Sequence, residues 1–132
     1  MITLKVKTQY RCQFLDITRD ITKAVRESGI PDGILLIFCP HTTAGITINE
    51  NADPAVLNDI NLKTSKFVDH HDPDYRHGEG NSDSHIKSSF FGASETVIIE
   101  RGTLVLGQWQ GIFFAEFDGP RNREVFLKTI PG

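Results

Sequence analysis

The sequence predicts a single α+β domain in which a mostly antiparallel sheet packs against two main helices and one short helix. Three observations predict this class. The chain has 132 residues, a length that suits one hydrophobic core. Strand-like and helix-like segments alternate up to Phe91, and only strand-like apolar segments follow it. We therefore expect residues 1–132 to form one domain.

The first third of the chain is expected to contain three strands and one helix. Residues 2–11 alternate apolar and polar side chains, which is typical of a strand with one solvated face. A helix capped by Asp16 or Thr18 follows. Gly29 ends this helix, and Pro31 prevents it from continuing. Two further strands are predicted, at the apolar run 33–39 and at the alternating residues 44–50.

A second helix, a long loop and a short helix are expected in the middle of the chain. Asp53 and Pro54 supply a capping carboxylate followed by proline at the first helical position. Residues 68–84 have no periodicity and are rich in Asp, His, Gly and Pro. A loop of this length inside a small domain is usually functional or disordered. Ser84 is the expected cap of a short helix that runs to Phe91.

Four apolar segments, separated by glycine-containing turns, close the chain. They are rich in Val, Ile, Leu and Phe, so each is predicted to be a strand. The turns between them favour an antiparallel meander of sequential neighbours. The segments are residues 96–101, 103–108, 109–117 and 124–130.

Composition and charge exclude several classes of function. The net charge of -3 gives no basic surface for nucleic acid. No apolar stretch approaches the roughly 20 residues that span a bilayer, and the start does not resemble a signal peptide. The two cysteines, Cys12 and Cys39, are too few for a disulfide scaffold, so we expect buried free thiols. These features predict a cytoplasmic protein without a membrane or nucleic-acid partner.

Histidines gather at two places that suit a functional site. His41 follows a predicted buried strand, where Pro40 restrains the backbone just before the imidazole. Four of the five histidines lie in the stretch from 70 to 85, which can fold several imidazoles toward one point. We expect His41, His77 and His85 to share a pocket, with His70 and His71 outside it. Three histidines can hold a catalytic zinc, although the spacing matches no standard zinc motif.

Two other polar clusters each have a structural and a functional interpretation, and the sequence leaves both open. Asn51 and Asp53 either make a turn and a helix cap, or place an anion at a helix start. Arg121 and Arg123 lie on a turn after Asp118. They are either a solvated hairpin tip or a phosphate clamp, for which the forked donors of arginine are well suited.

Taken together, seven motifs in chain order resemble the YjbQ family, also called the secondary thiamine-phosphate synthases. The resemblance covers nearly the whole chain, and Gln108 is the main departure, because family members often have threonine there. The motifs are His-Thr-Thr-Ala-Gly (41–45), Asn-Glu-Asn-Ala-Asp-Pro (49–54), Tyr-Arg-His (75–77), Gly-Asn (80–81), Ser-His-Ile-Lys-Ser-Ser (84–89), Gly-Gln-Trp-Gln-Gly-Ile (107–112) and Glu-Phe-Asp-Gly-Pro-Arg (116–121).

The resemblance implies a YjbQ-like fold, a homotrimer and an enzyme with weak thiamine-phosphate synthase activity. That transferase joins a pyrimidine diphosphate to a thiazole phosphate and releases pyrophosphate. It also implies a site of His41, His77 and His85, with a divalent metal (zinc or magnesium) or an anion; the histidines act as metal ligands or as acid–base groups. A small phosphorylated molecule is the expected ligand. Its predicted contacts are Thr43, Asn49, Asn51, Asp53, Asn81, Lys87, Trp109, Glu116 and Arg121.

Two alternative functions remain open on the sequence. The first is a metal-dependent hydrolase of a small phosphorylated or cyclic molecule, in which three histidines and a carboxylate such as Asp53 or Glu116 activate a metal-bound water. The second is a trimeric module that binds a ligand or a metal without catalysis.

Overall fold

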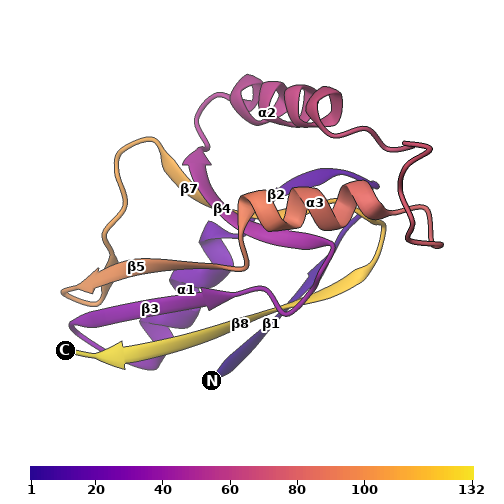
Figure 1. The fold of residues 1–132 in the computed structure, drawn as a ribbon. Coiled ribbons are helices and arrows are strands. Elements are labelled where there is room, and N and C mark those ends of the chain that lie inside the picture. The colour runs from indigo at the N-terminus through magenta and orange to yellow at the C-terminus, as the bar shows by residue number, and fades with distance from the viewer.

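Eight strands and three helices make up the fold, which we describe from a computed structural model of residues 1–132 (Figure 1). No helix is long or apolar enough to span a bilayer. In chain order the elements are β1 (Ile2–Lys7), β2 (Gln13–Asp16), α1 (Thr18–Ser28), β3 (Gly33–Phe38), β4 (Ala44–Glu50), α2 (Pro54–Phe67), α3 (Ser82–Phe91), β5 (Ser94–Glu100), β6 (Thr103–Leu104), β7 (Gln110–Glu116) and β8 (Asn122–Pro131).

The strands form two antiparallel sheets. The larger has the order β1-β8-β3-β5-β6 and the smaller has the order β2-β7-β4. The expected α+β class, with a mostly antiparallel arrangement and three helices, is confirmed. The predicted meander of the last four strands is wrong, because only β5 and β6 pair with each other in sequence. Strand β7 lies in the middle of the smaller sheet, between β2 and β4, and it is buried along nearly its whole length.

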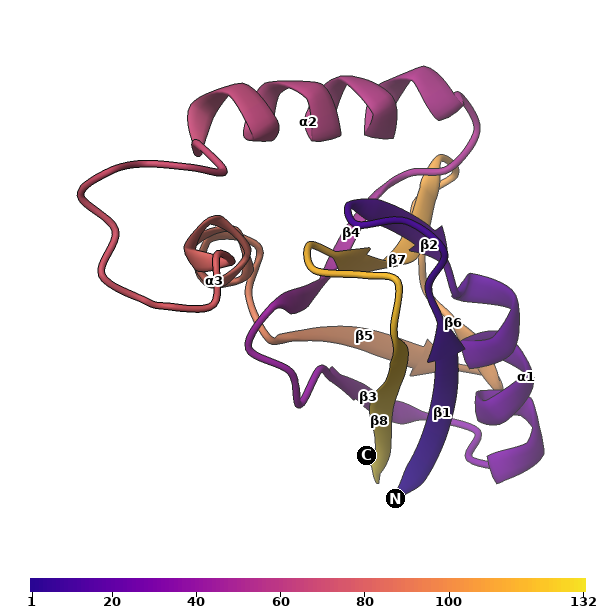
Figure 2. The same cartoon turned by 90° about the vertical axis from the view of Figure 1, so that its right-hand side faces the viewer.

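The hydrophobic core lies between the inner faces of the two sheets and helix α1. Leu35 and Ile37 of the larger sheet and Ile46 and Phe114 of the smaller one are fully buried in one cluster. Helix α1 contributes Ile21, and Figure 2 shows this helix on the opposite side of the molecule from α3. Residues from both sheets therefore form a single core, as the chain length predicts.

The other face of the smaller sheet lies toward α2 and α3 (Figure 2). A Cβ on Gly45 would lie 2.7 Å from the carbonyl oxygen of Gly92, so the end of α3 approaches β4 more closely than a side chain would allow. Helix α3 buries Asp83, Ser84 and Lys87. Helix α2 has no buried residue, so it is the least embedded of the three helices.

Local signals placed most helix ends correctly. Gly29 ends α1 with φ +70°, and the Asp53 carboxylate accepts a hydrogen bond from the Ala55 amide at 2.9 Å at the start of α2. The predicted cap of the short helix is three residues late, because Asn81 is the cap and α3 begins at Ser82. Ser84 does not cap it: its buried hydroxyl donates to the Phe117 carbonyl at 2.6 Å and ties α3 to the end of β7.

Candidate functional site

His41 lies in the turn between β3 and β4 and is fixed by a backbone contact. The amide of Glu124 on β8 donates to His41 Nε2 at 2.9 Å. Burial and the nearby Arg123 guanidinium lower the pKa of His41 below its ordinary value. The ring is therefore neutral at pH 7, and because Nε2 accepts a hydrogen bond, Nδ1 carries the proton. His41 is thus a hydrogen-bond donor through Nδ1.

A polar cleft of about 320 Å³ lies beside His41. It brings together the turn after β3, the start of α3 and the turn that precedes β8, so distant parts of the sequence meet there. Its walls carry no apolar side chain other than that of a proline. The lining residues are Pro40, His41, Thr42, Thr43, Glu79, Asn81, His85, Asp118, Arg121 and Arg123.

A buried ion pair between Glu116 and Arg123 forms the base of this region. The Glu116 side chain is fully buried and that of Arg123 is 6% exposed, and two guanidinium nitrogens donate to the carboxylate. Arg123 also donates to Thr43 Oγ1 at 2.8 Å. Thr43 and Glu116, both predicted to contact substrate, are therefore held in an internal network. Arg123, which the sequence placed only on a turn, is its centre.

Asn81, Asp118 and Arg121 form a second network at the rim of the cleft. Asn81 Nδ2 and Arg121 Nη2 both donate to Asp118 Oδ2, at 2.8 and 3.0 Å. Burial alone would raise the pKa of Asp118, but these hydrogen bonds, together with the charges of Arg121 and Arg11, outweigh it and the pKa lies below its ordinary value. The Oδ1 of Asn81 is buried without a hydrogen-bond partner. Arg121 remains half exposed, so part of its guanidinium faces solvent.

His77 lies near His85 but does not line the cleft that contains His41. The rings of His77 and His85 are 5.2 Å apart between centroids and nearly perpendicular. Together they border a separate hollow of about 450 Å³. His70 and His71 lie outside the His41 cleft, but they border another hollow that includes His77. His85 and Glu79, whose carboxylate lies 3.6 Å from His77 Nε2, therefore both link the His41 cleft to the histidine-rich loop.

The three predicted ligands do not make a metal site within one chain. No group of three or more His, Cys, Asp or Glu side chains is arranged to hold an ion. The Nε2 lone pair of His41 accepts a hydrogen bond from the Glu124 amide, so it is not free to bind a cation. The donor set of one chain thus does not fit a zinc or magnesium ion here.

Lys87, also predicted to contact substrate, is buried away from the cleft. Its Nζ lies 3.9 Å from Asp83 Oδ2 and 3.8 Å from Cys12 Sγ, and the residue is 2% exposed. Arg11, which sequence reasoning missed, pairs with both Asp83 oxygens at 3.0 Å. Burial opposes ionisation of Asp83, yet the Arg11 hydrogen bonds keep its pKa below the ordinary value. This cluster anchors α3 to the segment between β1 and β2.

Four predicted substrate contacts lie at the far end of β4. A seven-residue strand is about 20 Å long, so this group is well separated from His41. Asp53 caps α2, and the Asn51 side chain donates to Asp16 at 3.3 Å. Trp109 is 57% exposed. The predicted set therefore divides into a group near His41 and a second group of Asn49, Asn51, Asp53 and Trp109.

Comparisons with known proteins identify the family. The family model described as "UPF0047 protein YjbQ-like" matches residues 2–132. The UPF0047 protein YugU of Bacillus subtilis is 53% identical, with 97% of each chain covered, and a UPF0047 protein of Methanocaldococcus jannaschii is 55% identical, with 96% of this chain and 91% of the relative covered.

Solved structures of similar proteins have the same fold. A YjbQ/UPF0047 protein from Clostridium acetobutylicum is 56% identical, with a TM-score of 0.96 over 98% of this chain and all of the other. A protein of unknown function from Sulfolobus solfataricus is 33% identical, with a TM-score of 0.94 over 99% and 96% of the two chains. The chain therefore belongs to the UPF0047 family of YjbQ-like proteins.

Proposed function

We propose that the His41 cleft binds the phosphate or diphosphate group of a small molecule, and that the protein is a transferase with thiamine-phosphate synthase activity. The reaction joins a pyrimidine diphosphate to a thiazole phosphate and releases pyrophosphate. One observation carries the proposal: His41, His85 and Arg121, three side chains with nitrogen donors suited to an anion, line a single polar cleft.

Each of these groups has a role in holding negative charge. His41 donates through Nδ1 without adding a charge. Arg121 supplies the guanidinium donors that Asp118 does not occupy. Asn81, the residue before α3, also lines the cleft, and its side-chain amide donates to Asp118 and holds that carboxylate in place. Oriented donors of this kind stabilise the charge that develops on a departing diphosphate.

Pyrophosphate binding tests the anion site. We expect Arg121→Ala to weaken binding at least tenfold, because a charged hydrogen bond is worth about 1.5–3 kcal/mol. His41→Ala should weaken it a few-fold, since a neutral donor contributes about 0.5–1.5 kcal/mol. Arg19→Ala is the matched control, because Arg19 is exposed on α1 and has no partner. Calorimetric titration measures all four proteins, and equal affinities would place the anion site elsewhere.

A double variant separates two effects of Arg121→Ala. Removing the guanidinium also leaves the Asp118 carboxylate unpaired beside the anion. If Arg121 acts as a donor, Arg121→Ala with Asp118→Asn should stay weaker than Asp118→Asn alone. Each titration is repeated after chelation and with added zinc or magnesium. Formation of thiamine phosphate from both precursors tests the activity itself, and no product with the wild-type protein would contradict the transferase assignment.

We also propose that the chain assembles as a homotrimer. The outer face of the larger sheet supports an assembly of this kind: Ile34 lies opposite both Ile98 and Ile130 in the strand register, and all three are exposed. Phe38 stacks on Phe126 on the same face. An apolar surface of this extent on a small chain usually marks an interface. Sedimentation at micromolar concentration should give three times the chain mass of 14.8 kDa, and a monomer would contradict the assembly.

A further inference from the structure

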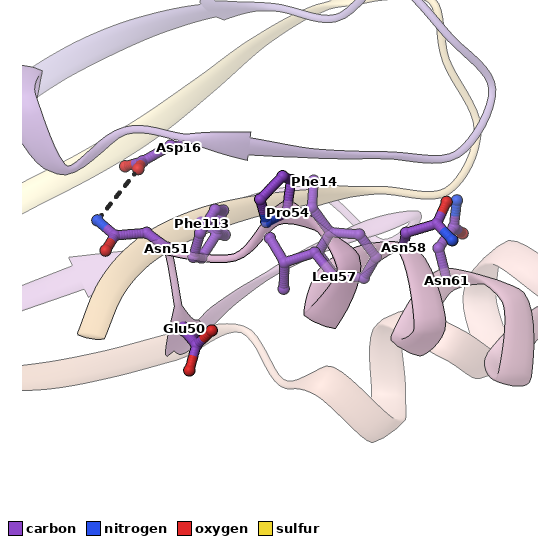
Figure 3. A pocket seen from close by; sticks show the side chains of 9 residues that line it. All are labelled: Phe14, Asp16, Glu50, Asn51, Pro54, Leu57, Asn58, Asn61 and Phe113. Atoms are coloured by element: carbon purple, nitrogen blue, oxygen red, sulfur yellow. Dashed lines mark hydrogen bonds between the residues drawn. The ribbon is translucent and has the colours of Figure 1, made fainter. Parts of the chain in front are cut away.

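A second cleft, of about 350 Å³, lies between the first half of α2 and the smaller sheet (Figure 3). This volume is within the range of small-molecule sites. Phe14, Leu57 and Phe113 supply its apolar surface. Pro54, three asparagines and two carboxylates complete the wall, and the full set is Phe14, Asp16, Glu50, Asn51, Pro54, Leu57, Asn58, Asn61 and Phe113.

The amides that face this region from α2 have hydrogen-bonding capacity to spare. Asn58 and Asn61 lie three residues apart, on neighbouring turns of one helix face. Neither side chain makes a hydrogen bond within the chain, and the Oδ1 of Asn61 is shielded from solvent without a partner. An amide shielded in this way costs about 1–3 kcal/mol unless it is paired. Helix α2 has no buried residue, so its side chains leave an open cleft between the helix and the sheet.

The charge of the cleft selects the ligand. Asp16 and Glu50 are its only ionisable residues, and no Lys, Arg or His lines it. The Asp16 carboxylate accepts hydrogen bonds from the Thr18 amide at 2.9 Å and from Asn51 Nδ2 at 3.3 Å, so its position is fixed. The Glu50 carboxylate points away from Asp16 (Figure 3) and accepts a hydrogen bond from the Asp53 amide at 3.3 Å. The negative charge of Asp16 beside an apolar wall favours a positively charged partner and repels an anion.

We propose that this cleft binds a small organic cation, an amine, amidine or guanidine carried on a flat apolar or aromatic body. The body lies against Phe14, Leu57 and Phe113. The cationic head pairs with Asp16, and the α2 amides, which lie at the other end of the cleft in Figure 3, bind polar atoms on the far end of the body. This site is separate from the His41 cleft, because the two lie at opposite ends of β4.

Benzamidine, benzamide and benzoate make a matched set of probes, with one shape and charges of +1, 0 and −1. In amide-resolved NMR titrations of the full chain, we expect benzamidine to shift the signals of Asn51, Asn58 and Asn61. It should bind at least tenfold more tightly than benzamide, and benzoate should not bind there. Equal binding of the three probes, or benzamidine shifts confined to the His41 cleft, would overturn the proposal.

Variants assign the binding to the residues named. Asp16→Asn should weaken benzamidine binding about tenfold, since it removes one charge but keeps a side chain that can cap α1. Asp59→Asn is the control, because Asp59 is exposed on α2 outside the cleft. Leu57→Trp should abolish binding by filling the space, with melting temperature as the check on folding. Unchanged affinity in either cleft variant would refute the site, whatever the outcome at His41.

Discussion

The buried pair of Glu116 and Arg123 makes a strong prediction about stability. The Glu116 carboxylate accepts five hydrogen bonds: from Thr8, twice from Arg123, and from the amides of Phe117 and Asp118. Glu116→Gln replaces one acceptor oxygen by an NH₂ group, which then faces donors. It also leaves the Arg123 guanidinium buried without a counter-charge. Breaking a buried pair in this way costs about 3–5 kcal/mol.

Urea unfolding measures that loss. With a slope of about 2 kcal/mol per molar urea, the midpoint should fall by roughly 1.5–2.5 M. Replacing both partners, with Glu116→Leu and Arg123→Met, removes both charges, so the double variant should lose less than the sum of the two single changes. Lys23→Met, which breaks the exposed pair with Glu27, is the control and should leave the midpoint nearly unchanged. If Glu116→Gln lowers the urea midpoint by less than about 0.5 M, roughly one quarter of the expected decrease, the reasoning is refuted.

Two further predictions concern pH and close packing. The folded pKa of His41 lies below its unfolded value of about 6.5, so the unfolded chain binds more protons near that pH and stability falls as pH drops below about 6.5. His41→Gln should reduce this loss, seen as a smaller difference in unfolding free energy between pH 7 and pH 5; an unaltered difference would contradict it. Gly45→Ala should lower the melting temperature, at a typical cost of about 1–3 kcal/mol, because its Cβ would contact the Gly92 carbonyl oxygen. Gly78→Ala is the control and should leave the melting temperature unchanged, because a Cβ there would have no atom within 4 Å. Equal melting temperatures for Gly45→Ala and the wild type would show that α3 shifts without cost and would contradict the prediction.

Local chemistry made several elements predictable from sequence. Gly29 and the Asp53-Pro54 pair determine helix ends through the conformation of single residues, so no distant contact is needed to recognise them. The alternating residues 44–50 match β4 at both ends. Strand pairing was not predictable in the same way, because alternation shows which face of a strand is buried but not which neighbour it meets. The position of β8 between β1 and β3 depends on contacts across more than 80 residues.

One signal in the sequence did point to the buried pair. Arg123 shares its strand face with Val125 and Leu127, and Glu116 shares its face with Ile112 and Phe114. A charged residue in a row of apolar side chains needs a buried partner, and two such residues of opposite sign predict each other. The division of the candidate site follows from the length of β4, which separates His41 from Asn51. The strand predicted at residues 44–50 already implied this separation, because an extended segment of that length spans about 20 Å.

The size and separation of the two clefts constrain how a condensation could proceed. Reacting atoms must approach to about 3–3.5 Å, so groups bound at opposite ends of β4, about 20 Å apart, cannot react with each other in one chain. Both substrates would have to meet at the His41 cleft. Its 320 Å³ is at the lower end of the range for a single small ligand. If the proposed condensation takes place there, residues of a second copy would have to enlarge the site for two phosphorylated heterocycles, which would link the proposed transferase activity to the proposed trimer. Pyrophosphate alone needs only the donors of one chain.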